Sequence, residues 1–390
     1  MSRRPSSPRW KIIIPIIIST VGVLLALPTI QQIIHGWFYP PVNYEQKILS
    51  TNFVGKLSSR VYIQNPLEHS LSELIGHEGD QYIVVVGPKG CGKSTLVKHV
   101  LAANPIGVIP LTMSKSFIDV YSAISKKLGA AEHEWDVDKI NYLFGNTTQL
   151  ARSKGFPSDW VPTIVVELDR VSTDVSVHNI ARDIKLLCSE TENCRGVLVL
   201  SDALDAFALP KDPRVKFFWV DDFTEDLAHQ FFDALNFLVG PSQVLGFCPG
   251  KEVCPELSAN FSLRAKIFST IGTRVSDLKN IVSNTKSNTR LIDSYISEKI
   301  SECKLTLKAL FSHEGKPSGA DFKEAARLIL KSPTKSFEAA SLINNGLVMP
   351  ANAATVLKEN HGLLFHIPSK HYRFYSKCHV TVASLMEDLK

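Results

Sequence analysis

The sequence has neither a strong excess of one charge nor a concentration of cysteine. Its 390 residues include 43 Lys and Arg against 38 Asp and Glu, a formal net charge of +5. A charge this mild does not by itself support a nucleic-acid function. Apolar residues make up 44% and charged residues 21%, which excludes a disordered chain, and the length allows two or three domains.

Zinc-binding cysteine pairs are also missing. Five residues separate Cys188 from Cys194 and Cys248 from Cys254, a wider spacing than that of the usual zinc pairs. The seven cysteines are an odd number, and Cys91 lies in a glycine-rich stretch where a disulfide would deform the backbone. We therefore expect structural thiols in a reducing compartment. We interpret the four C-terminal histidines as incidental, because their spacing suits neither a helix face nor a strand pair: His361, His366, His371 and His379.

One specific motif is present. A β-branched run at 82–86 leads into a glycine-rich turn that closes with Gly92-Lys93-Ser94 and opens into a helix-like stretch. This is the phosphate loop G-x-x-x-x-G-K-[ST] in its required context, with a strand before it and a helix after it. The residues expected to hold a nucleoside triphosphate are Gly87, Pro88, Lys89, Gly90, Cys91, Gly92, Lys93, Ser94 and Thr95.

The residue types of this loop suit phosphate binding. The glycines let successive N–H groups point inward as an anion-binding nest, and the following helix adds the positive end of its dipole. Lys93 supplies a point charge to the β- and γ-phosphates, and the Ser94 hydroxyl binds Mg²⁺. The sequence therefore predicts ATP and Mg²⁺ as ligands.

Apolar runs alternate with helical patterns on both sides of this loop. Beyond the loop strand, strands are expected at 106–111, 162–170, 196–202 and 216–220. Helices are expected at 67–75, 116–128, 140–151 and 177–190. This alternation predicts an α/β fold, a doubly wound parallel sheet of the P-loop NTPase type.

Two acidic residues compete for the role of holding Mg²⁺ on a strand that neighbours the loop strand. If the apolar run is 165–168, Asp169 binds the metal and Arg170 stands where a catalytic glutamate is common. If the run is 163–166, Glu167 binds the metal and Asp169 orients water. We favour Asp169, because a strand-end residue faces the ligand crevice of an open sheet. Without a clean Asp-Glu pair, we expect slow hydrolysis or a nucleotide switch.

Four further residues are candidates for catalytic assistance. Ser201 and Asp202 follow the next strand, where they either sense the γ-phosphate and the attacking water or cap a helix. Arg214 and Arg274 either act as charge-stabilising fingers, in cis or from a neighbouring subunit, or are surface arginines.

The N-terminus predicts a membrane anchor. A basic, serine-rich tail at 1–11 precedes the uncharged segment 12–34, which is long enough for a transmembrane helix, and a linker follows at 35–50. The basic tail places the N-terminus inside by the positive-inside rule, so the ATP-binding domain would face the other side. The mitochondrial inner membrane suits that topology. The alternative is translocation of the short tail at another intracellular membrane, with the bulk of the chain cytosolic.

Several segments together resemble the archaeal-type and STAND branches of the AAA+-like P-loop ATPases. They are 53–56, the loop at 87–95, the acidic strand at 165–169, and the segments 223–228 and 272–278. The resemblance covers roughly 50–300 and implies ATP binding in a core at 51–240, a helical lid at 241–300, and a capacity for homo-oligomer formation.

The region 301–390 predicts a winged-helix-like domain. Helical patterns at 303–311, 321–330 and 335–344 precede two alternating strands, 362–367 and 371–375, around Pro368-Ser369-Lys370. Basic residues interleaved with Tyr372 and Tyr375 would suit nucleic acid, although we favour a packing or protein-binding role. These basic residues are Lys331, Lys335, Lys358, Lys370, Arg373 and Lys377.

The sequence as a whole predicts a membrane-anchored ATPase that couples ATP binding or hydrolysis to the arrangement of core, lid and winged helix. The alternatives are a non-hydrolysing nucleotide switch or scaffold, and a membrane-tethered nucleic-acid-binding protein.

Overall fold

The computed structural model describes most of the chain beyond residue 42. The described residues are 43–51, 53, 61–76, 81–113, 119–130, 135–168, 174–209, 212–235, 237, 255–286, 288–315, 317–339, 353–354, 356–357 and 360–389. The chain divides into two units, Met1–Gln46 and Lys47–Lys390. Of the first unit only residues 43–46 are described, and they include the beginning of helix α2 (Tyr44–Ser50).

Within these described ranges no helix combines the length and the apolar character that a membrane span requires. The predicted transmembrane helix at 12–34 and the basic tail at 1–11 lie outside the described residues. The membrane anchor therefore stays a prediction.

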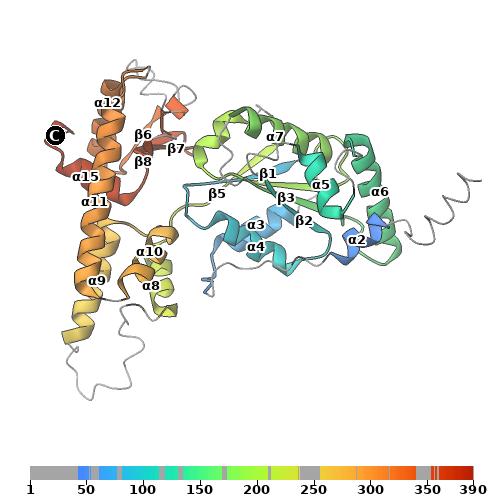
Figure 1. The fold of residues 1–390 in the computed structure, drawn as a ribbon, viewed down its shortest axis with the longest axis horizontal. Helices are drawn as coiled ribbons and strands as arrows, with labels where there is room; N and C mark the ends of the chain where they lie inside the picture. Colours follow the sequence, from blue (N-terminus) through green and yellow to red (C-terminus); the bar gives the residue numbers. More distant parts are fainter. Residues whose placement is uncertain are drawn as a thin grey trace, which may run out of the picture. The chain divides into compact units, whose positions relative to one another are not determined.

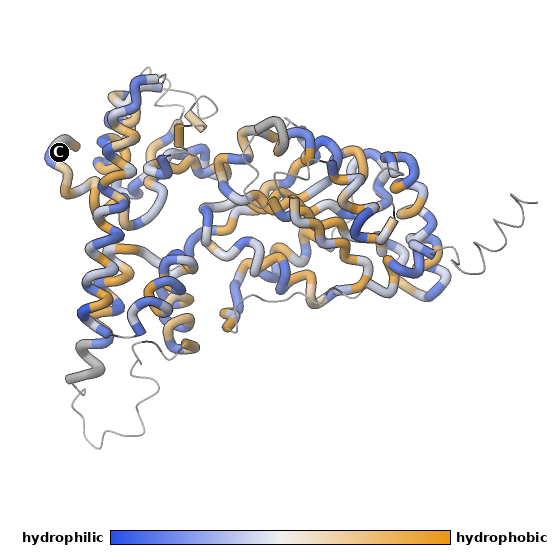
Figure 2. Tube along the Cα trace, viewed as in Figure 1, coloured by the Kyte–Doolittle hydropathy of each residue, from blue (hydrophilic) through white to orange (hydrophobic). Residues whose placement is uncertain are grey.

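A five-stranded parallel sheet organises the second unit, as predicted (Figure 1). The strand order is β2-β3-β4-β1-β5. The central strands are continuous apolar runs, because a parallel sheet is covered on both faces, and hydrophobic residues follow them in Figure 2. The strands are β1 (Tyr82–Val86), β2 (Val108–Met113), β3 (Thr163–Leu168), β4 (Arg195–Val199) and β5 (Val215–Trp219).

Helices cover the two faces of this sheet (Figure 1). The helix after the phosphate loop shares an apolar core with α3 and with residues of β1, β3 and β4. The opposite face packs against α5 and α7, with α6 beside α7. These helices are α3 (Leu67–Gly76), α4 (Lys93–Ala103), α5 (Val120–Leu128), α6 (Val137–Ser153) and α7 (Asp174–Cys188).

The strand order corrects one expectation. We predicted that the acidic strand, β3, neighbours the loop strand, β1. In the structure β4 lies between them, since Val84 of β1 pairs with Leu198, and Leu198 pairs with Val166 of β3. Sequence order does not specify which parallel strands pair, because each crossover helix allows more than one neighbour.

Four helices form a second core after the sheet. They share buried residues that include Phe232, Phe268, Leu278 and Ile292. Local signals set their ends, since Thr224 caps one helix and Asn288 another through side-chain oxygens. The helices are α8 (Glu225–Ala234), α9 (Pro255–Thr270), α10 (Val275–Thr285) and α11 (Thr289–Phe311).

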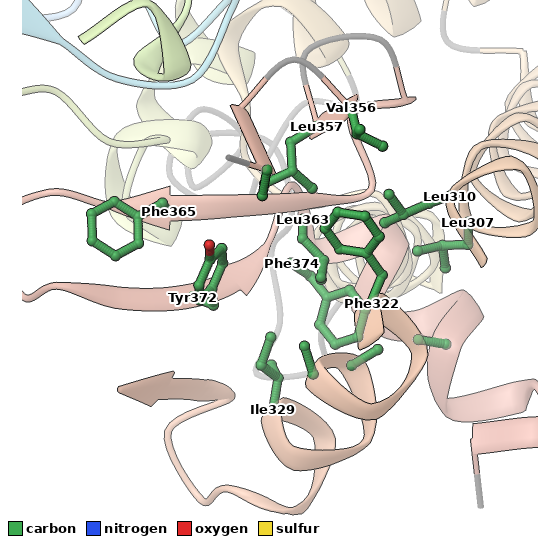
Figure 3. Packing of buried hydrophobic residues seen from close by; sticks show 14 of the residues in the cluster. Leu307, Leu310, Phe322, Ile329, Val356, Leu357, Leu363, Phe365, Tyr372 and Phe374 are labelled. Carbon is green, nitrogen blue, oxygen red and sulfur yellow. The ribbon is translucent and has the colours of Figure 1, made fainter. Parts of the chain in front are cut away.

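The C-terminal part packs a three-stranded antiparallel sheet, in the order β6-β8-β7, against helices. The predicted hairpin is confirmed, with Leu363 opposite Phe374 and Phe365 opposite Tyr372. Phe322, Ile329, Leu363 and Phe374 meet in its core (Figure 3). The elements are α12 (Gly319–Lys331), β6 (Ser336–Glu338), β7 (Leu363–His366), β8 (His371–Phe374) and α15 (Lys377–Leu385).

The helix predicted at 335–344 is wrong at its start. Ser336–Glu338 is the strand β6, in which Phe337 pairs with Tyr372 of β8. Helical periodicity was read from a short segment whose conformation is set by pairing with a strand far along the chain. Residues 340–344 lie outside the described residues.

Phe322→Ala tests the packing of the C-terminal core. Phe322 is 4% exposed and lies among apolar side chains, so its truncation should lower the free energy of unfolding by about 3–5 kcal/mol. Chemical denaturation followed by circular dichroism measures the change. Leu305→Ala, at a side chain 67% exposed, is the matched control and should change stability by less than about 0.5 kcal/mol. Equal effects of the two variants would contradict this packing.

Candidate functional site

The phosphate loop, residues 87–95, joins β1 to the first turn of α4. Gly90 has φ 83° and Gly92 has φ 101°, backbone conformations that other residues adopt only with strain. A Cβ atom at Gly87 would lie 2.0 Å from the carbonyl oxygen of Val220, which follows β5. The glycines are therefore needed both for the turn and for the close approach of β5, and the predicted strand–loop–helix context is confirmed.

Lys93 lies inside this loop. The residue is 5% exposed, and its Nζ donates to the carbonyl oxygens of Gly87 at 2.9 Å and Pro88 at 2.8 Å. A longer contact of 3.5 Å reaches the carbonyl oxygen of Ser201. The loop thus holds the Lys93 side chain at the N-terminus of α4, where main-chain N–H groups suit an anion.

Cys91 is the buried side of the same loop. It is 1% exposed, and its thiol donates to the carbonyl oxygen of Val220 at 3.3 Å. Burial raises the pKa of the Cys91 thiol, and the nearby Lys93 charge only partly offsets this. The protonated, shielded thiol therefore packs the loop against β5 and is not a reactive group.

A cavity of about 270 Å³ adjoins the loop. Phosphate-loop and α4 residues form one side and α8 and α10 residues the other, with mainly apolar side chains such as Leu96, Phe231 and Val282. The segment 61–65 forms a third side, and Tyr62 anchors it by stacking on His99 and donating to Glu68 Oε1 at 2.7 Å. An apolar cavity next to a phosphate-binding loop suits a nucleobase.

The two candidates for the metal-binding acid have different outcomes. Glu167 lies on β3, and its Oε2 is 3.0 Å from Nζ of Lys98 on α4. Asp169 and Arg170 lie outside the described residues. Ser94 lies in the first turn of α4, and within the described part of the chain no group of three or more His, Cys, Asp or Glu could hold a metal ion. The choice between Asp169 and Glu167 remains a prediction.

Ser201 and Asp202 lie beside the loop, at the end of the strand next to β1. Ser201 Oγ donates to Asp205 Oδ2 at 2.9 Å, and Asp202 caps the short helix η1 (Ala203–Ala208) with a reciprocal capping box. The capping interpretation of Asp202 is confirmed. Ser201 also approaches Lys93 through its carbonyl oxygen, so both residues belong to the site.

Arg274 precedes α10 and lies against the phosphate loop. It is 5% exposed, and it pairs with Asp222 through Nε at 2.9 Å and Nη2 at 3.2 Å. Burial alone would lower the pKa of Arg274, but the charge and hydrogen bonds of Asp222 raise it above its ordinary value. The next residue but one, Ser276, donates its N–H to Gly90 O at 3.0 Å. Arg274 is therefore no surface arginine, and it lies beside the loop of its own chain.

Arg214 has no such place. Its carbonyl oxygen accepts from the N–H of Tyr82, at the beginning of β1, and its guanidinium pairs with Asp212 and Glu190. The phosphate loop lies at the other end of β1, so Arg214 does not meet the loop of its own chain, and a role at a neighbouring subunit stays a prediction.

The sequence reasoning missed the contribution of the C-terminal strand β8 and its end. Arg373 forms a two-pronged pair with Asp221, at 2.6 and 3.0 Å. Tyr375 accepts the main-chain N–H of Lys89 on its hydroxyl at 3.2 Å. The nucleic-acid alternative needs these residues at the surface, but Arg373 is paired and Tyr372 and Tyr375 are 3% and 8% exposed. Consecutive acids at 221 and 222, directly after the last strand, were the available signal.

The parallel sheet with this strand order and its glycine-rich loop are those of the P-loop NTPase α/β fold. No protein-family model matches the chain, and no curated protein sequence does either.

Three solved structures illustrate what the fold is similar to. A Walker-type ATPase of Pyrococcus abyssi has a TM-score of 0.47 and 12% identity, over 82% of this chain and 95% of that chain. The structure of the ORC1 protein of Aeropyrum pernix in complex with DNA has a TM-score of 0.34 and 12% identity, over 85% of this chain and 95% of that chain. A structure of katanin self-assembly has a TM-score of 0.32 and 11% identity, over 63% of this chain and 77% of that chain.

Asp222→Ala tests the buried ion pair beside the loop. The change leaves the Arg274 charge buried without its carboxylate, so we expect a loss of about 3 kcal/mol in unfolding free energy. The exposed pair of Lys266 and Asp293, at 2.7 Å with both side chains more than half exposed, provides the control. Asp293→Ala should cost less than about 1 kcal/mol. Similar costs in both variants would contradict the buried role of Asp222.

The pair of Asp221 and Arg373 predicts a pH dependence. Burial would raise the pKa of Asp221, but hydrogen bonds from Arg373 and its charge hold that pKa below its ordinary value. The pair therefore stabilises the fold fully above the ordinary aspartate pKa of about 3.9, and this contribution disappears as the pH falls through the lowered value. The stability difference between wild type and Asp221→Asn should be constant near pH 7 and shrink toward zero in acid. A difference independent of pH would contradict the charged pair.

Proposed function

We propose that this protein is an ATPase of AAA+ type that belongs with the archaeal-type and STAND branches. ATP binding or hydrolysis would set the arrangement of three parts of the chain. They are the sheet domain, the helices α8 to α11, and the part from α12 to α15, here called the C-terminal unit. The observation that carries the proposal is the buried ammonium of Lys93 inside a glycine loop beside an apolar cavity.

The residues present fit a nucleoside triphosphate with Mg²⁺. Main-chain N–H groups of 87–95 and Lys93 would hold the phosphates, and the cavity lined by Leu96 and Phe231 would take the base. Ser94 and Asp169 would hold the metal, with Glu167 as the alternative acid. Bound Mg²⁺ would neutralise charge that develops on the phosphates.

The helices after the sheet contact the phosphate loop through the beginning of α10. Ser276 of α10 donates its N–H to Gly90 O at 3.0 Å, and a Cβ atom at Gly90 would lie 2.2 Å from Ser276 Oγ. These contacts support the proposal that a change in the loop backbone would shift the beginning of α10. Arg274, which precedes α10, is in a position to meet negative charge at the loop, in cis.

We propose a winged helix for the C-terminal part, on the ground of its strand connectivity. α12 leads into β6, and the hairpin β7–β8 then places β8 between β6 and β7. This order supports the winged-helix proposal. Burial of Tyr372 and Tyr375 and the pairing of Arg373 favour a packing role over nucleic-acid binding.

Residues 12–34 would anchor the protein in a membrane, the mitochondrial inner membrane or another intracellular one, and the ATPase could act as a homo-oligomer. Protease protection of the C-terminus in intact organelles tests the topology. Complete digestion of the C-terminus in intact organelles would rule out the inner-membrane topology in which the ATPase domain lies across the membrane from the N-terminus.

A non-hydrolysing nucleotide switch is the second candidate. The observation that favours it is the ion pair of Glu167 with Lys98, because a carboxylate held by lysine is a poor metal ligand or base. The sequence also has Arg170 in the place of a second acid.

Binding and phosphate release together test the proposal. Lys93→Ala should weaken MgATP binding at least about tenfold, because it removes the charge inside the loop. Lys216→Ala, an exposed lysine on β5, is the matched control and should leave binding unchanged. Properly folded full-length protein with no affinity for MgATP would overturn the proposal.

Asp169→Ala and Glu167→Gln identify the acid that supports turnover. The residue that binds the metal should, when changed, abolish phosphate release at saturating MgATP. Wild-type protein that binds MgATP but releases no phosphate would support the switch instead of the ATPase.

A further inference from the structure

The hydroxyl of Tyr375 lies against the phosphate loop. It accepts the main-chain N–H of Lys89 at 3.2 Å and approaches Asp202 Oδ2 at 3.3 Å, to which it donates. Tyr375 follows β8, 286 residues beyond Lys89, so the C-terminal unit supplies an oxygen atom to a donor of the loop.

Surrounding contacts fix the position of this hydroxyl. The main-chain N–H of Tyr375 donates to Gly362 O at 3.2 Å, and its carbonyl oxygen accepts from Arg274 Nη2 at 2.6 Å. The Arg274 guanidinium also lies 4.6 Å from the centre of the Tyr375 ring. Two residues earlier, Arg373 is paired with Asp221. Because the ring packs against Arg274 and the residue is 8% exposed, movement of the hydroxyl away from the loop must disturb the contact with Arg274.

The protonation state of Tyr375 suits this contact. Burial and the nearby Asp202 carboxylate raise the pKa of Tyr375. A neutral hydroxyl can accept one hydrogen bond from Lys89 and donate another to Asp202 at the same time. The hydroxyl oxygen thus imitates one oxygen atom of a phosphate toward the loop, without its charge.

An N–H group has one hydrogen to donate, so a phosphate oxygen and the Tyr375 hydroxyl cannot both accept it at full strength. Lys89 lies in the first half of the loop, and the helix N-terminus that follows Gly92 holds phosphate at the other half. The contested donor is therefore at the end of the loop away from the helix. A phosphate there would also add negative charge beside Asp202.

We propose that Tyr375 competes with the terminal phosphate of the nucleotide for the Lys89 N–H, so that tight triphosphate binding and docking of residues 371–376 exclude each other. The inference rests on the proposed function. Its consequence is that triphosphate binding releases the end of β8, and Arg274 then loses the Tyr375 carbonyl and ring while it keeps Asp222. The C-terminal unit thereby distinguishes triphosphate from diphosphate.

Tyr375→Phe tests the competition. The variant keeps the ring on Arg274 but removes the hydroxyl, so MgATP should bind about two- to tenfold more tightly to the full-length protein, as expected for one hydrogen bond. Tyr372→Phe is the matched control, because the Tyr372 hydroxyl is buried and has no hydrogen-bond partner among the described residues. Its affinity should equal that of wild type. MgADP should bind wild type and Tyr375→Phe equally.

Hydrogen exchange without nucleotide gives a second readout. The peptide that contains the Lys89 amide should exchange faster in Tyr375→Phe than in wild type or Tyr372→Phe, because that amide has lost its acceptor. Unchanged exchange would overturn the contact. Equal or weaker MgATP binding by Tyr375→Phe would overturn the competition, and an equal gain for MgADP would overturn the assignment to the terminal phosphate. If wild-type protein fails to bind MgATP, as Lys93→Ala is expected to do, that result overturns the proposed function and not the Tyr375 contact.

Discussion

The ammonium group of Lys93 can be buried only where oxygen atoms replace the water that it loses, because an unpaired buried charge is costly. The carbonyl oxygens of Gly87, Pro88 and Ser201 surround it. Two of these belong to the loop after β1 and one to the end of β4, so the charge fixes two neighbouring strands relative to each other. The same loop approaches the end of β5 closely, since Gly87 leaves no room for a Cβ atom beside Val220 and the buried Cys91 thiol donates to the Val220 carbonyl oxygen.

Two consecutive acids after β5 each form an ion pair with an arginine of a later part of the chain. Asp222 holds Arg274, which precedes α10, and Asp221 holds Arg373 of β8. Both acids follow the same strand at the carboxyl edge of the sheet, where open α/β sheets bind their ligands. The beginning of α10 and the strand β8 are thus both attached to the sheet within three residues of the end of β5.

Local patterns predicted the parts of this structure that local physics determines. The phosphate loop, the helix after it and the apolar strands depend on glycine conformation and on residue periodicity, and the structure contains them. Strand order and the β6 pairing depend on contacts between distant segments, and both were missed. The sequence favours a packing or protein-binding role for the region of Arg373 and Tyr375 but does not identify their partners, because Asp221 and the loop are more than 150 residues away. A basic or aromatic residue carries no sign of such a partner in its own neighbourhood.

β5 is an edge strand of the sheet, paired only with β1 in the strand order of the described residues. Its last residue, Trp219, lies under His366, with ring centres 4.5 Å apart, and under the Arg373 guanidinium at 5.5 Å. Edge strands with uncovered aromatic residues promote association between molecules. The hairpin β7–β8 therefore covers the indole of Trp219, while Phe217 on the same strand remains 42% exposed. The proposed release of residues 371–376 would uncover this indole at an edge of the sheet, where an exposed aromatic side chain favours association between molecules.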